Sequence, residues 1–147
     1  MLFNTSEIAI SGRFNGPAGF RTEMAKHRLP IQASRKLNGS NMYGSADFAI
    51  ATVIGRLRGW GGQKISTPMA ARMCEQIDRE TLAVAIAQLE AGEITDLFIC
   101  LPSWGEELEG FTCVFTSADD VAAALADTDL IVIEVGAILT EKLKEYS

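Results

Sequence analysis

Residues 31–44 read IQASRKLNGSNMYG, a polar, basic and glycine-bearing stretch between two segments with helical periodicity. The dipeptide Asn38-Gly39 accepts positive φ at both central positions of a tight turn. The stretch therefore predicts two short extended arms joined by a turn at residues 37–40. Arg35 and Lys36 stand at the base of this hairpin, so the hairpin carries two cations.

Helices are predicted on both sides of the hairpin. One begins at Asn4 or Thr5 and ends at Ser11-Gly12, one begins at Asn15-Gly16-Pro17 and runs to about His27, and one runs from Ser45 to the glycine-rich break at 59–62. We expect Ser45 to cap the third helix and Asp47 to complement its dipole. The order is helix, helix, hairpin, helix.

The period of the apolar residues changes in the second half. A further helix begins at Thr67-Pro68, continues or restarts at Asp78 and ends at Gly92. The predicted elements after it are strands at 97–101, 111–115 and 130–135, a helix capped by Ser117, and a final helix. We therefore predict an α+β protein. Its parts are a winged helix-turn-helix at 1–66, linking helices at 67–92 and a small acidic α/β domain of about three strands at 93–147.

The sign of the charge changes along the chain. The whole protein holds 13 basic and 19 acidic residues. Residues 1–66 hold 9 basic against 3 acidic, a net charge of +6, whereas residues 67–147 hold 4 basic against 16 acidic, a net charge of −12. A basic half joined to an acidic half indicates a module that binds a polyanion, and nucleic acid is the commonest one.

The order of elements in the basic half is that of a winged helix-turn-helix. In that arrangement the second helix enters the major groove and the hairpin lies along the backbone or in the minor groove. Separate elements each offer cations, as the positioning of phosphates requires. The predicted DNA-binding residues are Arg13, Arg21, Lys26, Arg28, Arg35, Lys36, Asn38, Arg56 and Arg58.

Three runs, FNTSEIA, HRLP and RKLNGSNMYGSADFAIATVIGRLRGWG, resemble a divergent MerR-type winged helix-turn-helix. Tyr43 and Asp47 stand where that family closes its wing with Tyr and opens the next helix with Asp. The resemblance covers roughly residues 2–77. The chain has GRFNGPAGFRTEM in place of the family's Gly-Val turn and Arg-Tyr-Tyr-Glu signature, so base-reading residues are not carried over, and the family's long dimerising helix is missing. The resemblance implies a small regulator of the phage or mobile-element kind.

These features predict a cytoplasmic, sequence-specific regulator of transcription that binds double-stranded DNA as a homodimer. Candidate interface residues for the dimer are Leu139, Leu143 and Tyr146. An equally good interpretation is that these three residues cover the chain's own sheet. One alternative is a protein-binding adaptor or inhibitor whose acidic half imitates DNA or binds a basic surface. Another is an excisionase-like recombination-directionality factor. No residue pattern names a small-molecule effector.

The chain is poor in catalytic and metal-binding patterns. Its only histidine is His27, and its three cysteines, Cys74, Cys100 and Cys113, lack C-x-x-C spacing. The acidic residues of 106–109 are not in a calcium-loop pattern and are expected to be solvated. We therefore expect neither enzyme activity nor a metal or cofactor. The longest apolar runs are too short to span a membrane, and the first residues lack a signal peptide.

Overall fold

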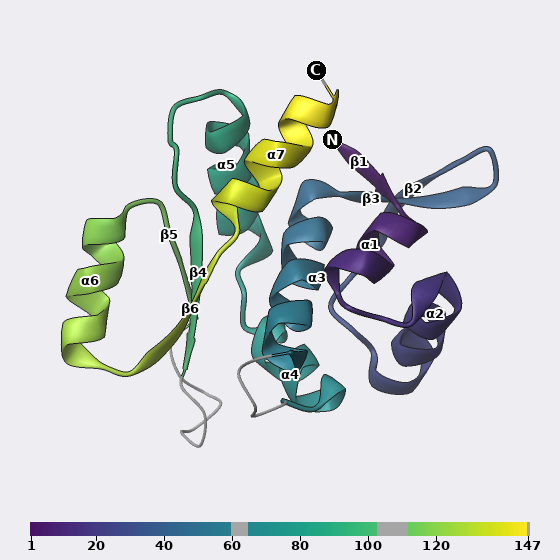
Figure 1. Ribbon diagram of the computed structural model, residues 1–147, viewed down its shortest axis with the longest axis horizontal. Coiled ribbons are helices and arrows are strands. Elements are labelled where there is room, and N and C mark those ends of the chain that lie inside the picture. Colours follow the sequence, from purple (N-terminus) through teal and green to yellow (C-terminus); the bar gives the residue numbers. More distant parts are fainter. Residues whose placement is uncertain (60–64, 103–111, 147) are drawn as a thin grey trace. The chain divides into compact units, whose positions relative to one another are not determined.

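The computed structural model describes residues 1–59, 65–102 and 112–146, with the side chain of Tyr146 excepted. The chain divides into two compact units, Met1–Glu75 and Gln76–Ser147. Within the described residues there are seven helices and two antiparallel sheets of three strands each (Figure 1). The predicted α+β class is confirmed. No described helix combines the length and apolar character needed to cross a membrane.

Unit 1, residues 1–75, contains a three-stranded sheet and four helices. Its elements are β1 (Leu2–Asn4), α1 (Thr5–Ser11), α2 (Gly16–His27), β2 (Ala33–Leu37), β3 (Ser40–Gly44), α3 (Ser45–Arg58) and α4 (Thr67–Glu75). The predicted hairpin is present: β2 pairs antiparallel with β3, with Leu37 opposite Ser40. Asn38 and Gly39 form the turn with φ of 51° and 81°, the left-handed conformation that the Asn-Gly dipeptide predicted.

Strand β1 has no counterpart among the predicted elements. It pairs with the free side of β3, so the sheet order is β1-β3-β2. Its central residue, Phe3, is fully buried and stacks on Phe48 of α3 with 4.2 Å between ring centroids. Three residues are too few to show the two-residue alternation by which strands are recognised in a sequence. Only the tertiary pairing reveals this strand.

Helix α3 is the central helix of unit 1, and most of its residues are buried. It approaches α1 closely because position 55 is glycine: a Cβ there would overlap the carbonyl oxygen of Ser11. The predicted Ser45 cap is wrong by one residue. Gly44 is the N-cap and makes no side-chain capping bond, whereas Asp47 is buried and accepts a hydrogen bond of 2.8 Å from the N–H of Gln32. Asp47 thus ties the start of α3 to the segment that leads into β2.

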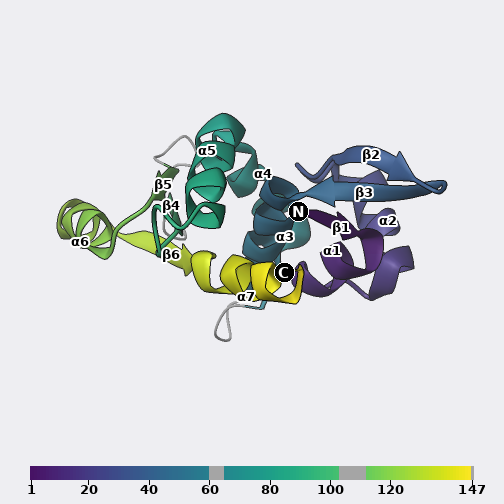
Figure 2. The same ribbon diagram turned by 90° about the horizontal axis from the view of Figure 1, so that it is seen from above.

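Unit 2, residues 76–147, packs helices on both faces of its sheet. Its elements are α5 (Arg79–Glu90), β4 (Phe98–Pro102), β5 (Cys113–Phe115), α6 (Ala118–Asp127), β6 (Leu130–Glu134) and α7 (Gly136–Tyr146). Strands β5 and β6 both pair antiparallel with the central β4, so they run parallel to each other and α6 is their crossover. Figures 1 and 2 both show α6 on one face of the sheet and α5 with α7 on the other.

Side-chain caps fix the starts of two helices in unit 2. The Asp78 carboxylate accepts from the N–H groups of Glu80 and Thr81 and from the Thr81 hydroxyl. These hydrogen bonds, led by that of the Thr81 side chain, lower the Asp78 pKa. Ser117 caps α6 by accepting from the N–H of Asp120, as the sequence predicted.

The predicted segment boundaries differ from the observed elements in two places. The helical stretch 67–92 consists of two helices, α4 and α5, separated by the Asp78 cap; α4 belongs to unit 1 and α5 to unit 2. The strand predicted at 111–115 is observed as Cys113–Phe115, and Phe111 lies outside the described residues. The strands predicted at 97–101 and 130–135 are observed within one residue of those bounds, as β4 and β6.

The change in charge sign coincides with the division into units. The sequence of unit 1 holds 10 basic and 4 acidic residues, a net charge of +6, and that of unit 2 holds 3 basic and 15 acidic residues, a net charge of −12. Unit 1 thus attracts negatively charged partners, and unit 2 attracts positively charged ones.

Candidate nucleic-acid interface

A hollow of about 430 Å³ in unit 1 lies between the start of α1, the start of α2 and the hairpin. Two predicted DNA-binding residues line it: Arg21 from α2 and Lys36 from β2. The residues that line the rest of the hollow include Asn4, Ser6, Pro17 and Asn41. Figure 1 shows that the hairpin and α2 extend on the same side of unit 1. The fold thus brings together two cations that are 15 positions apart in the chain.

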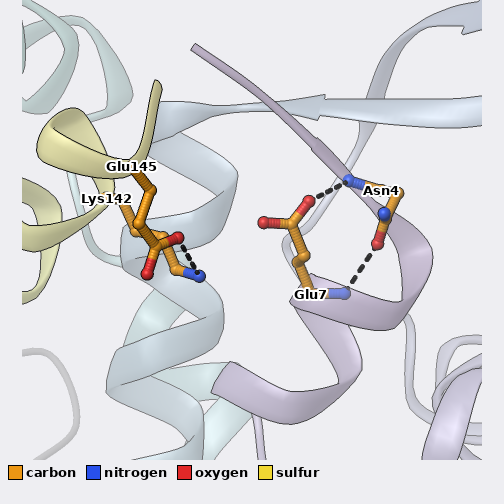
Figure 3. A network of polar contacts seen from close by, with 4 residues as sticks. All are labelled: Asn4, Glu7, Lys142 and Glu145. Carbon is orange, nitrogen blue, oxygen red and sulfur yellow. Dashed lines mark hydrogen bonds and ion pairs between the residues drawn. The ribbon is translucent and has the colours of Figure 1, made fainter. Parts of the chain in front are cut away.

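The start of α1 is fixed by a reciprocal capping box (Figure 3). The Asn4 side chain accepts from the N–H of Glu7 at 2.9 Å, and the Asn4 N–H donates to the Glu7 carboxylate at 3.2 Å. The cap that was predicted at Asn4 or Thr5 is therefore Asn4. The spacing of three residues between Asn4 and Glu7 predicts a helix start and does not indicate that this cap borders the hollow.

Helix α2 presents its predicted cations in different directions. Arg21 is exposed and faces the hollow. Lys26 is also exposed, but five residues turn an α-helix by about 140°, so Lys26 lies on another side. Arg28 lies beyond the helix as its C-cap, with φ of 47°.

Three aromatic rings hold α2 against the base of the hairpin. Phe20 of α2 lies 5.4 Å from the Phe14 ring and 5.9 Å from the Tyr43 ring of β3, between ring centroids. All three residues are buried. Because these rings are packed and rigid, the distance between α2 and the hairpin is fixed by the core and not by the exposed cations themselves.

The hairpin divides its two cations between two faces. Lys36 pairs with Asn41 and both line the hollow, whereas Arg35 is the preceding residue and pairs with Met42. Successive side chains of a strand point to opposite faces, so Arg35 projects away from the hollow. Asn38 is exposed at the tip. Every residue of β2 is exposed, so the whole strand is accessible to a ligand.

The end of α3 is joined to the turn between α1 and α2. The Arg58 guanidinium donates to the carbonyl oxygens of Gly12 at 2.9 Å and Arg13 at 3.0 Å, and it lies 4.7 Å from the Phe14 ring centroid. Arg58 is half-buried, so its first role is to hold this turn. Arg13 is exposed in the turn with φ of 55°, and Arg56 is exposed on α3.

The residues predicted for a dimer interface differ in their accessibility. Leu139 is buried, with 1% of its surface exposed, so it cannot serve a partner without opening unit 2. Leu143 is half-buried. The Tyr146 side chain lies outside the described part of the chain, although α7 extends to that residue. Near the end of α7, Lys142 and Glu145 form an exposed ion pair of 3.2 Å (Figure 3).

The histidine is engaged with a carboxylate, two of the three cysteines are buried and the third is half-buried. His27 Nε2 lies 3.3 Å from the Glu23 carboxylate, one helical turn away. Burial raises the pKa of Cys74, raises that of Cys100 to about 11 with a smaller contribution from Cys113, and raises that of Cys113. Over residues 1–59, 65–102 and 112–146 no three His, Cys, Asp or Glu side chains form a metal-binding group. The acidic residues of 106–109 fall outside these ranges.

No family model matches this chain, and no curated protein matches it at a significant level. The observations that bear on its function are therefore its own: the positive charge of unit 1, the hollow between α2 and the hairpin, and the negative charge of unit 2.

Proposed function

We propose that the chain is a sequence-specific DNA-binding protein that regulates transcription, probes DNA with α2 and the hairpin of unit 1, and acts as a dimer. In this proposal unit 1 is a winged helix-turn-helix related to the MerR type. The order helix, helix, hairpin, helix supports it, as does the net charge of +6 on unit 1. The single observation that carries it is the hollow in which Arg21 and Lys36 meet.

The chemistry of this hollow suits a phosphate of the DNA backbone. Arg21 supplies a planar guanidinium and Lys36 an ammonium, and both are exposed. Asn4, Ser6 and Asn41 add polar groups of the kinds that commonly bond to phosphate and sugar oxygens. A phosphate held here would place the exposed side of α2 against the adjacent groove, with Arg35 and Asn38 reaching the next part of the backbone.

The remaining predicted contacts have unequal parts in the proposal. Arg13 and Arg56 are exposed, so each is free to approach a phosphate. Lys26 lies on another side of α2, and Arg28 lies beyond its end. Both are proposed as peripheral contacts that attract DNA by charge but do not fix the position of the protein along it. Arg58 acts through the turn that it holds, because its guanidinium is already bonded to two carbonyl oxygens.

The test is the salt dependence of DNA binding by the full chain and by Arg21→Ala and Lys36→Ala variants. Fluorescence anisotropy with labelled genomic fragments is measured from low to physiological salt. Each phosphate contact contributes about −0.9 to the slope of log affinity against log salt. We expect each variant to bind more weakly and to lose about one unit of slope. Arg72→Ala is the matched control, since Arg72 is an exposed cation on α4 outside the predicted set.

Two outcomes separate failure of the site from failure of the function. If the parent chain binds no genomic fragment at low salt, the proposal of DNA binding is wrong. If the parent binds but Arg21→Ala, Lys36→Ala and Arg72→Ala behave alike, then DNA binding holds and the hollow is not its site. Circular-permutation gel assays add a third readout, because strong bending at a single site would favour the recombination-directionality function over regulation.

A further inference from the structure

Unit 2 has an open groove of about 370 Å³ between α5 and the edge strand β5. One wall is formed by Glu80, Val84 and Gln88, which recur every four residues along α5 and therefore share one helical face. The other wall is formed by Val114 and Thr116 at β5. Val84 is 60% exposed, which leaves an apolar side chain facing water above this groove.

The outer edge of β5 is unpaired within the described part of unit 2, since β4 is the only strand that β5 pairs with there. The register indicates which of its groups face outward. Leu97 accepts from the N–H of Val135, on the β6 side of β4. The main-chain groups of an antiparallel strand alternate between its two sides, so Ile99 also faces β6, and Val114, opposite Ile99, directs its N–H and C=O away from β4.

Val114 therefore offers two things at the same place: main-chain groups that no described strand pairs with, and a side chain in the groove. A strand laid beside β5 would bond to those main-chain groups and turn alternate side chains toward α5. Residues i and i+4 of a helix are about 6 Å apart along its axis, and residues i and i+2 of a strand are about 6.6 Å apart. Two alternate side chains of the added strand can thus meet Val84 and Glu80 together.

Charge decides what kind of strand fits. The sequence of unit 2 carries a net charge of −12, and Glu80, at the groove, has no ion-pair partner among the described residues. A second copy of unit 2 would bring the same negative charge to the edge and would be repelled. A cationic segment would be attracted, and its basic residue would face the Glu80 carboxylate while an apolar residue covers Val84.

We propose that the groove between α5 and β5 binds an extended, basic segment of another protein as an added strand on β5. In that segment a lysine or arginine and an apolar residue stand two positions apart, so that both face α5. This activity is separate from DNA binding by unit 1. It gives unit 2 a role as the module that recruits a cationic protein partner.

The experiment uses the full chain and a labelled nine-residue alternating peptide in which lysine and valine alternate along one side of the strand, with threonine at every second position. We expect saturable binding by fluorescence anisotropy, with amide shifts at Val114 and Thr116 in two-dimensional NMR spectra. A blocked peptide of the same composition, with its lysines at one end and its valines at the other, is expected to bind at least about tenfold more weakly, because only the alternating peptide turns a lysine and a valine two positions apart toward the groove.

Two variants of α5 test the groove at constant charge. Val84→Arg places a cation in the groove, and Ala83→Arg places the same cation on the exposed neighbouring position, about 100° away around the helix. We expect Val84→Arg to weaken the alternating peptide about tenfold and Ala83→Arg to weaken it no more than about twofold. Both substituted residues are exposed, and circular dichroism checks that both variants fold.

Three results would overturn the proposal. Equal affinity for the alternating and blocked peptides would show attraction by net charge alone. Equal loss in Val84→Arg and Ala83→Arg would exclude the groove as the binding site. Concentration-dependent dimerisation in sedimentation velocity that Val84→Arg abolishes would show that a second copy of the chain occupies the groove instead.

Discussion

Replacement of Arg58 by alanine tests whether this residue holds the turn between α1 and α2. The guanidinium donates two hydrogen bonds, to Gly12 and Arg13, and lies over the Phe14 ring. Gly12 and Phe14 also form main-chain bonds to α1, to the carbonyl oxygens of Ile8 and Ala9. Loss of the Arg58 contacts should therefore loosen the chain on both sides of the turn.

The magnitude follows from these contacts. Hydrogen bonds to a charged group are worth about 1.5–3 kcal/mol each, and an exposed cation–π contact about 0.5–1 kcal/mol. Arg58 is half-buried, so water can solvate the two carbonyl oxygens after truncation and the full sum is not lost. We expect a local loss of about 2 kcal/mol, which corresponds to roughly 30-fold faster opening-limited exchange.

The assay is native-state hydrogen exchange at the Gly12 and Phe14 amides, which reports unit 1 without requiring the two units to unfold together. Arg56→Ala is the matched control because it removes the same charge from the same end of α3 at an exposed position. Exchange rates in Arg58→Ala within twofold of those in Arg56→Ala would refute the role of Arg58 in the turn. In DNA binding, Arg58→Ala should keep the parent's salt slope, whereas a direct phosphate contact would lose about one unit.

Four further predictions test the packing and the thiols. Gly55→Ala should destabilise unit 1 by about 1–3 kcal/mol, because the new Cβ would overlap the Ser11 carbonyl oxygen. Hydrogen exchange of the α3 amides measures this loss, and unchanged exchange rates would show that α1 and α3 can move apart without cost. Asp47→Ala should cost about 1–3 kcal/mol by the same measurement because it leaves the Gln32 N–H without its acceptor, and Asp47→Asn should cost less because its amide oxygen can still accept. Burial raises the Cys100 pKa from an ordinary 9.0 to about 11, so the folded state holds this proton more tightly than the unfolded state, and stability should fall as pH rises from about 9 to about 11. At pH 8 iodoacetamide should label half-buried Cys113 before Cys100 and Cys74, as followed by mass spectrometry, and rapid labelling of Cys74 would contradict its burial.

Local chemistry accounts for what the sequence predicted correctly. Asn38-Gly39 specifies its turn because few other dipeptides accept two positive φ angles, and Ser117 and Asp78 specify helix starts because their side chains bond to N–H groups two or three residues away. The change of charge sign also lies in the sequence. Such signals span a few residues and require no knowledge of distant parts of the chain.

The hollow between α2 and the hairpin could be predicted only in part. The sequence identified Arg21 and Lys36 as cations on two elements, but it gave no reason to rank them above the other seven predicted DNA-binding residues. Their accessibility depends on the fold: Arg58 is drawn to the α1–α2 turn because Gly55 lets α3 approach α1, and Arg28 lies outside α2 because the helix ends there in a left-handed C-cap. Neither effect is visible in the spacing of residues.

The sequence by itself determined the α+β class, the hairpin with its turn, most helix starts and the opposite charges of the two halves. The tertiary structure alone decided that β1 completes a sheet, that Leu139 is buried, and that Arg21 and Lys36 line the same hollow while Arg35 faces away. It also decided that no described strand pairs with the outer edge of β5 beside Val84. The physical reason is the separation along the chain of the residues that interact. Turns, caps and charge are properties of neighbouring residues, whereas burial and convergence arise from contacts between segments that are far apart in the chain.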